Sequence, residues 1–252
     1  MKIAIISDLH GNMPALKAVL ADMSFFNPDQ IYCLGDLTDA APWHNEVMEL
    51  IRALEIPTIM GNHDERIAFD HPVLPLQKHS QIEQEARLAA INFTKQDITA
   101  SNKAFLATLL PSLRIEVDGL NILLVHGSPD SNEEYLYEDR EEHMVIEMFR
   151  KQGVDLIICG HTHLSYLRFF SDFVTQSDKL LINAGSVGRS KEEDRKACYL
   201  QLEILAANEA SGLDRLKPTI RKISYSIEET IEGIKNSPIP DFYADFLSNI
   251  KT

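Results

Sequence analysis

Short apolar runs that end abruptly in acidic, amide or imidazole side chains constrain the fold of this chain more than any other sequence feature. The runs occupy 2–6, 31–34, 58–60, 122–125 and 156–159. The residues directly behind them include Asp8, His10, Asp36, Asn62, His63, His126, His161 and His163. Apolar runs of this length are typical of buried strands. Ligands of an open α/β sheet bind outside the carboxyl ends of its strands, so the pattern predicts one shared site.

The first part of the chain alternates strand-type and helix-type segments. Helical patterns at 13–23 and 44–54 separate the apolar runs at 2–6, 31–34 and 58–60. This βαβαβ order predicts parallel strands joined by right-handed crossovers.

Residues 65–113 interrupt this alternation of strand-type and helix-type segments. A loop marked by prolines is followed by two helical patterns, at 81–96 and 101–111. We interpret this stretch as a helical insertion. Because it follows the 61–64 segment directly, we expect it to form a lid or a wall of the substrate pocket.

Strand-type runs return after 113, with one helical pattern that ends at Gly153. The later half is thus richer in antiparallel strands, which predicts a second sheet packed on the first. Segment 226–250 predicts a helix, a proline break and a second short amphipathic segment. We expect this tail to cover a sheet or to form an oligomer contact rather than to take part in catalysis.

The chain carries a formal net charge of −14. General nucleic-acid binders and proteins that bind anionic membranes present a positive face, so this charge argues against both classes. The cysteines Cys33, Cys159 and Cys198 lie in strand-type runs, which favours buried thiols in a reducing compartment. Residues 1–8 resemble neither a signal peptide nor a membrane span, so we expect a cytoplasmic protein.

The candidate metal ligands combine two carboxylates, one amide and four imidazoles. They are Asp8, Asp36, Asn62, His10, His126, His161 and His163. Mixed hard oxygen and borderline nitrogen donors suit Mn, Fe, Zn or Co better than Mg or Ca, and seven ligands fit two ions better than one. A single histidine in a strand is more often structural, but this constellation favours a metal site. Glycines among the ligands, at 11, 35, 61, 127 and 160, are expected to let the strands turn sharply.

Five motifs built on these residues resemble, in order and spacing, the calcineurin-like metallophosphoesterase superfamily. They are D-L-H at 8–10, G-D-L-T-D at 35–39, G-N-H-D at 61–64, H-G-S at 126–128 and G-H-T-H at 160–163. N-A-G-S-V-G at 183–188 is similar to an element of the small bacterial phosphodiesterases, with Ala184 in place of their usual proline. The resemblance implies one domain over 1–252. Its α/β fold would be two mixed β-sheets packed as a sandwich, with helices on the outer faces.

The resemblance also implies a role for each residue. One metal ion would be bound by Asp8, His10 and His163, and the other by Asn62, His126 and His161, with Asp36 bridging both. His63 would be the general acid, and Asp64 would orient its imidazole. A hydroxide between the two ions would attack a small phosphate ester, with a diester favoured, and His63 would protonate the leaving oxygen.

Other functions of the same fold stay open at this point. Ala40 and Ala41 stand where the related protein phosphatases and diadenosine tetraphosphatases have Arg and Gly, which weakens both assignments. A phosphomonoesterase or another nucleotide hydrolase is a further alternative. The retromer subunit of the superfamily is a binding scaffold that lacks the catalytic histidine, whereas His63 is present here.

The physiological substrate depends on segments without a recognisable motif. The acidic loop at 130–143 is most simply a solvated surface, and its functional alternative is a rim that disfavours multiply charged phosphates. Arg66, His79 and Arg189 could reach a substrate, but each fits a surface ion pair equally well.

Overall fold

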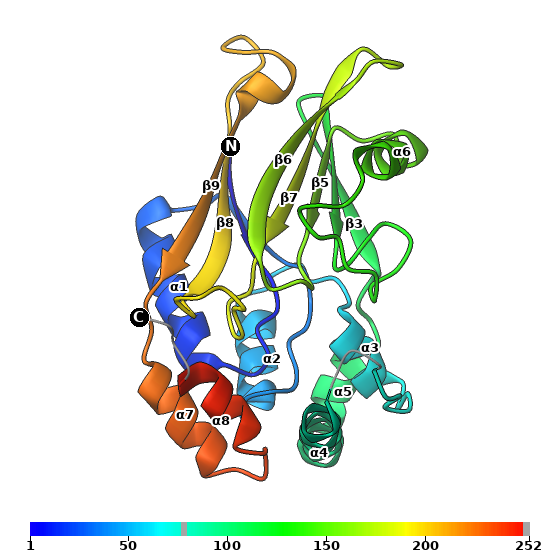
Figure 1. Ribbon diagram of the computed structural model, residues 1–252. Coiled ribbons are helices and arrows are strands. Elements are labelled where there is room, and N and C mark those ends of the chain that lie inside the picture. The colour runs from blue at the N-terminus through cyan, green and yellow to red at the C-terminus, as the bar shows by residue number, and fades with distance from the viewer. Residues whose placement is uncertain (77–79, 249–252) are drawn as a thin grey trace.

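Two mixed β-sheets pack face to face in the computed structural model, which describes residues 1–76 and 80–248 (Figure 1). The first sheet has the strand order β2-β1-β8-β9. Its strands are β1 (Lys2–Ile6), β2 (Gln30–Cys33), β8 (Ala197–Ile204) and β9 (Leu216–Ile223). β1 is parallel to β2 and antiparallel to β8, so this sheet is mixed.

The second sheet has the strand order β3-β4-β5-β7-β6. Its strands are β3 (Ser112–Val117), β4 (Leu120–Val125), β5 (Leu156–Cys159), β6 (Ser165–Asp172) and β7 (Ser177–Ala184). The central strands β4, β5 and β7 are parallel, and both edge strands are antiparallel to their neighbours. The predicted sandwich of two mixed sheets is therefore confirmed.

Helices cover both outer faces of the sandwich and one of its ends (Figure 1). α1 (Met13–Phe26) and α2 (His44–Ala53) pack on the first sheet, and α6 (Glu142–Gln152) packs on the second. The helices at the lower end in Figure 1 are α3 (Asn62–Ala68), α4 (Gln81–Asp97), α5 (Ala100–Leu106), α7 (Ile227–Lys235) and α8 (Phe242–Ser248). A short 3-10 helix, η1 (Gly212–Arg215), precedes β9.

The apolar runs are continuous because both faces of the central strands are buried. In β1, Ile3 and Ile5 face the second sheet, whereas Ala4 and Ile6 face the helices on the outer side. Side chains alternate between the two faces of a strand, so each run contributes to two separate cores. Ile158 of β5 lies opposite Ile3 and Ile5 in the core between the sheets.

The prediction of a strand at 58–60 is wrong. Thr58 and Ile59 form only isolated bridges, to Cys33 and to Leu110. The amide of Ile59 donates to Cys33, but the next amide, that of Met60, donates to Leu110 instead. The segment therefore turns away from the end of β2 before a ladder can form.

Two places are expected for the C-terminal tail, on a sheet or in an oligomer contact, and the structure contradicts the first. α7 and α8 pack against α4 and against Ala40 and Ala41, in a small core of their own, and do not cover a sheet. Residues 249 and 250 of the predicted amphipathic segment lie outside the described residues.

Several local predictions are confirmed. Asp118 and Gly119 both have positive φ, 49° and 84°, in the turn between β3 and β4, and Gly153 caps α6 at φ 64°. All three cysteines are free and buried. Among the described residues, no helix is both long and apolar enough to span a bilayer.

Ile158→Ala should lower the free energy of unfolding of the metal-free protein by about 2–5 kcal/mol, because the cavity opens between two sheets that cannot collapse. Denaturant titration measures this loss. Ile82→Ala is the matched control, because Ile82 is 70% exposed on α4, and it should change stability by less than about 0.5 kcal/mol. Equal losses at both positions would contradict the placement of Ile158 in the core.

Candidate metal centre

Six of the seven candidate ligands form two compact clusters where the strands of both sheets end. One cluster is Asp8, His10 and His163, and the other is Asp36, His126 and His161. Within each cluster the potential ligand atoms lie within 4.8 Å of one another. The residues follow β1, β2, β4 and β5, so both sheets contribute to the same site.

Asp36 lies between the two clusters, and Asn62 lies beside the second one. Asp36 Oδ2 is 3.4 Å from His126 Nε2 and 3.8 Å from His10 Nε2. Asn62, the first residue of α3, places its Oδ1 3.2 Å from His126 Nε2. The carboxylate of Asp36 is thus the group that both clusters share.

Backbone carbonyls orient all four imidazoles in the same way. His10 Nδ1 lies 2.9 Å from the carbonyl of Thr38, and His126 Nδ1 lies 2.8 Å from that of Leu34. His163 Nδ1 and His161 Nε2 face the carbonyls of Arg189 and Glu133. Since a carbonyl only accepts, each of these ring nitrogens carries the proton of the neutral ring. The other nitrogen of each ring therefore faces the site and can offer a lone pair to a metal ion when the ring is neutral.

These inward-facing nitrogens meet at short distances that suit a bound cation. His10 Nε2 lies 3.1 Å from His163 Nε2, and His126 Nε2 lies 3.2 Å from His161 Nδ1. Asp8 Oδ1 is buried and makes no hydrogen bond among the described residues. When the rings are neutral, their converging lone pairs and this carboxylate oxygen repel one another unless a cation lies between them. The donor set therefore fits divalent transition-metal ions.

The protonation of these groups follows from burial and from their neighbours. Burial lowers the pKa of His10 and of His161 to about 3, which keeps both rings neutral and able to bind metal. Burial also opposes protonation of His126, but the charge of Asp36 outweighs it and raises the pKa of His126 to about 10. Burial disfavours the charged form of Asp8, yet His163 holds the pKa of Asp8 well below its usual range.

The backbone is in the left-handed region at most of the ligand positions. The φ angles of Asp8, His10, Asp36, His161 and His163 are 54°, 46°, 55°, 64° and 62°. Non-glycine residues rarely adopt such angles, and each costs of order 1–3 kcal/mol unless the surrounding structure stabilises it. The sharp turns predicted for the strand ends therefore lie largely at the ligands themselves.

The glycines near the ligands serve two different purposes. Gly11 and Gly35 have positive φ, as the prediction of sharp turns requires. Gly160 allows close approach instead, because a Cβ there would lie 2.6 Å from Asp8 Oδ2. Gly61 does the same for Asp36, whose Oδ1 would be 2.1 Å from the added atom.

His63 belongs to neither cluster, and Asp39 rather than Asp64 orients its ring. His63 Nδ1 lies 2.5 Å from Asp39 Oδ2, and its ring meets that of His10 edge to face at 5.0 Å. The predicted role of Asp64 is wrong, because its carboxylate accepts from the amides of Asp36, Leu37 and Gly61. Burial and the charge of Asp36 raise the pKa of Asp64 to about 7. Asp64 thus stabilises the loop that carries Asp36.

A cleft of about 380 Å³ opens above the clusters and contains residues that sequence reasoning did not assign. Tyr135 of the acidic loop stacks on His161, with ring centroids 4.0 Å apart. Phe242, Tyr243 and Phe246 of α8 also line the cleft, as does Arg189. Nothing local in the sequence connects these side chains to the ligands, because they come from other parts of the chain.

The other two substrate-contact candidates have different outcomes. Arg66 is buried beside the site and pairs with Glu133 at 3.3 Å, so it lies close to Asn62 without lining the cleft. His79 lies outside the described residues.

Comparison with known proteins gives a consistent result. A sequence model of the calcineurin-like phosphoesterase superfamily domain matches residues 1–206. Protein MJ0912 of Methanocaldococcus jannaschii is 29% identical over 256 residues, which cover 97% of this chain and 96% of that protein. The crystal structure of a metallophosphoesterase from Sphaerobacter thermophilus matches with a TM-score of 0.77 and 26% identity, over 100% of this chain and 99% of that one. A symmetrical bis(5′-nucleosyl)-tetraphosphatase of Pectobacterium atrosepticum is 37% identical over 68 residues, 25% of this chain and 24% of that protein.

Asp36→Asn should lose at least one of two bound metal ions, because a carboxylate offers one charged oxygen to each cluster and an amide does not. Metal content per chain, measured by mass spectrometry after gel filtration, checks this expectation. Asp178→Asn, on the exposed surface of β7, is the control and should keep both ions. Full occupancy in the Asp36 variant would remove Asp36 from the centre.

Proposed function

This chain belongs to the calcineurin-like phosphoesterase superfamily, and we propose that it hydrolyses phosphate esters, with phosphodiesters as its main substrates and two transition-metal ions as cofactors. The observation that carries the proposal is the pair of ligand clusters joined by Asp36. When bound, two such ions supply an activated water and stabilise the charge that develops on a phosphoryl group.

The chain's own residues would hold the two ions close together. Asp8, His10 and His163 form one half of the centre, and Asn62, His126 and His161 form the other, with Asp36 common to both. Two divalent ions outweigh the charges of Asp8 and Asp36, so the centre would be positive within an acidic protein. Such a positive centre would bind an anionic phosphoryl group.

His63 is placed to move a proton at the leaving oxygen. Its Nδ1 is engaged with Asp39 Oδ2, so Nε2 is the ring nitrogen that can exchange a proton with a substrate. The side chain of His63 is 19% exposed and lines the cleft, whereas Asp39 is buried. The contact with a buried carboxylate holds the ring in one orientation, which a general acid needs.

Two observations bear on the choice between substrate classes. The similarity of 183–188 to small bacterial phosphodiesterases favours diesters, and the cleft of about 380 Å³ is large enough for a small diester. Nucleotide hydrolysis is the second candidate, because a bis(5′-nucleosyl)-tetraphosphatase matches a quarter of the chain. The presence of His63 argues against a purely structural scaffold.

The protein stripped of metal and reloaded with Mn, Fe, Zn or Co, one at a time, should hydrolyse bis(4-nitrophenyl) phosphate with a higher kcat/KM than 4-nitrophenyl phosphate. Absorbance of released nitrophenolate measures both reactions, and the stripped protein is the control. A preference for the monoester would make the chain a phosphomonoesterase. Failure with every metal and both esters would contradict phosphoesterase activity altogether.

His63→Ala should keep both metal ions and lose turnover in a way that depends on the leaving group. The aryl group of an aryl diester departs as a stable anion that needs little protonation, so the kcat for this ester should fall modestly. The leaving group of an alkyl diester is a basic alkoxide that needs a proton. The kcat for this ester should therefore fall by an amount near the upper end of about 10²- to 10⁴-fold. Kinetics on ethyl 4-nitrophenyl phosphate and diethyl phosphate, together with metal analysis, separate these outcomes.

Asp39→Asn is the companion to the His63 variant. This variant keeps the shape of the side chain that contacts His63 Nδ1 but removes its charge. Its kcat should therefore show the same dependence on the leaving group, with a smaller loss than in His63→Ala.

Equal losses of kcat on both esters in the His63 variant would indicate that His63 binds the phosphoryl oxygen. Loss of a metal ion would make His63 a ligand.

A further inference from the structure

Arg189 is fixed directly beside the first ligand cluster by its backbone. Its carbonyl lies 2.7 Å from His163 Nδ1, and its amide donates to Ser186 Oγ at 2.8 Å. The amide of Lys191 donates to the carbonyl of His163 at 3.1 Å. Segment 189–191 is therefore tied to a candidate metal ligand on both sides of residue 190.

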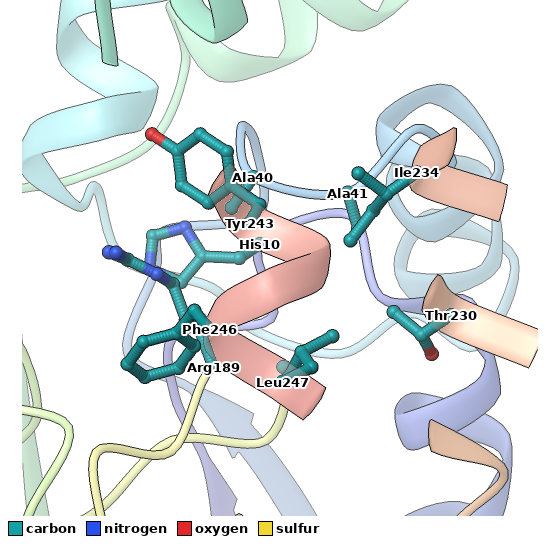
Figure 2. Close-up of a pocket in the computed structure, with 10 residues that line it drawn as sticks. His10, Ala40, Ala41, Arg189, Thr230, Ile234, Tyr243, Phe246 and Leu247 are labelled. Carbon is teal, nitrogen blue, oxygen red and sulfur yellow. The ribbon is translucent and has the colours of Figure 1, made fainter. Parts of the chain in front are cut away.

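The side chain of Arg189 is oriented by aromatic rings rather than by a carboxylate. Its guanidinium carbon lies 5.1 Å from the ring centroid of Tyr243 and 5.1 Å from that of Phe246. Figure 2 shows it beside His10, with these two rings of α8 on either side. Its Nε is buried without a hydrogen-bond partner, and no described carboxylate lies within ion-pair distance of it. The rings orient this cation but do not neutralise it.

The rest of the cleft adds positive charge at the same place. Lys191 and Arg87 line the cleft together with Arg189. Outside the metal clusters, Glu83 is the acidic residue among the described lining residues. Three cations against one carboxylate give the cleft a local charge opposite to that of the whole chain.

The acidic loop at 130–143 does not reverse this charge. Asp130, Glu133 and Glu134 pair with Lys151, Arg66 and Arg140, at 2.5, 3.3 and 2.8 Å. None of these three carboxylates lines the cleft, to which the loop contributes Tyr135 and Tyr137. The loop therefore places no carboxylate on the lining of the cleft.

We propose that Arg189, supported by Lys191, is a substrate-binding residue that holds a second phosphoryl group, distinct from the one that is cleaved. This inference rests on the proposed function and narrows it to esters with two phosphoryl groups. A guanidinium with free N–H donors, in a cleft that an ammonium also lines, matches a dianionic phosphoryl group better than it matches a carboxylate.

The test compares three esters with one leaving group: ethyl, 2-carboxyethyl and 2-phosphonoethyl 4-nitrophenyl phosphate. The wild-type, metal-loaded protein should prefer the phosphonoethyl ester in kcat/KM. In Arg189→Gln, the ratio of kcat/KM for the phosphonoethyl ester to kcat/KM for the ethyl ester should fall by about 10- to 100-fold, mainly through a higher KM. The kcat/KM for the ethyl ester itself should change little. Arg189→Lys keeps the charge without the fork of donors, so it should retain part of the preference.

Arg195→Gln is the matched control, because Arg195 lies over the same Phe246 ring at 4.1 Å but does not line the cleft. It should leave the preference unchanged. No preference in the wild type, or equal losses on all three esters in Arg189→Gln, would overturn the second-phosphoryl site. Equal preference for the carboxyethyl ester would overturn its assignment to a phosphoryl group.

A binding titration separates this inference from the proposed function. Ethane-1,2-diphosphonate should bind the metal-loaded wild type at least about tenfold more tightly than ethylphosphonate, and Arg189→Gln should remove the difference. If no ester is hydrolysed but this difference is found, the proposed activity fails and the anion site stands. If esters are hydrolysed but the difference is absent, the anion site fails.

Discussion

The burial of like-charged and lone-pair-bearing groups in one small volume is the constraint on which this structure depends. Asp8 and Asp36 are fully buried within a few ångströms of four imidazoles whose acceptor nitrogens point inward. Such an arrangement is unfavourable in a low-dielectric interior without compensating positive charge. The surrounding carbonyls, close-approach glycines and left-handed backbone all serve to hold these groups together. The sandwich supplies the rigidity that this requires, because the ligands directly follow strands of two packed sheets.

Around the centre, the cleft is lined by residues from inside and from outside the segment that the family model matches. The family match ends at residue 206, whereas the rings of Phe242, Tyr243 and Phe246 lie beyond it. These rings and α4 border the cleft, so the segments outside the sandwich determine what can approach the metal ligands. The candidate ligands thus follow strands of the sandwich, whereas much of the cleft lining comes from loops and added helices, as is common on a rigid scaffold.

The sequence was sufficient to predict the sandwich and the convergence of the ligands, because strand ends and ligand residues are adjacent in the chain. It failed where the contact is not local. Asp64 is adjacent to His63 in the sequence, whereas Asp39 lies 24 residues before it, and only the path of the loop after β2 shows that Asp39 reaches the ring. The bridge at Thr58 and Ile59 resembled a strand because apolar composition does not reveal where the backbone amides turn. The position of α8 depends on tertiary packing that no local pattern encodes.

The place of β1 in the first sheet has a consequence for the order in which this protein folds. β1 carries Asp8 and His10 at its end, but it lies between β2 and β8, and Ile5 pairs with Leu200. The amino-terminal strand therefore pairs with a strand that lies almost two hundred residues later in the chain. Pairing across so long a separation slows folding, since the loop must close before the contacts form. A growing chain therefore exposes Asp8 and His10 long before it can bury them, and late closure of the first sheet governs when the two clusters form.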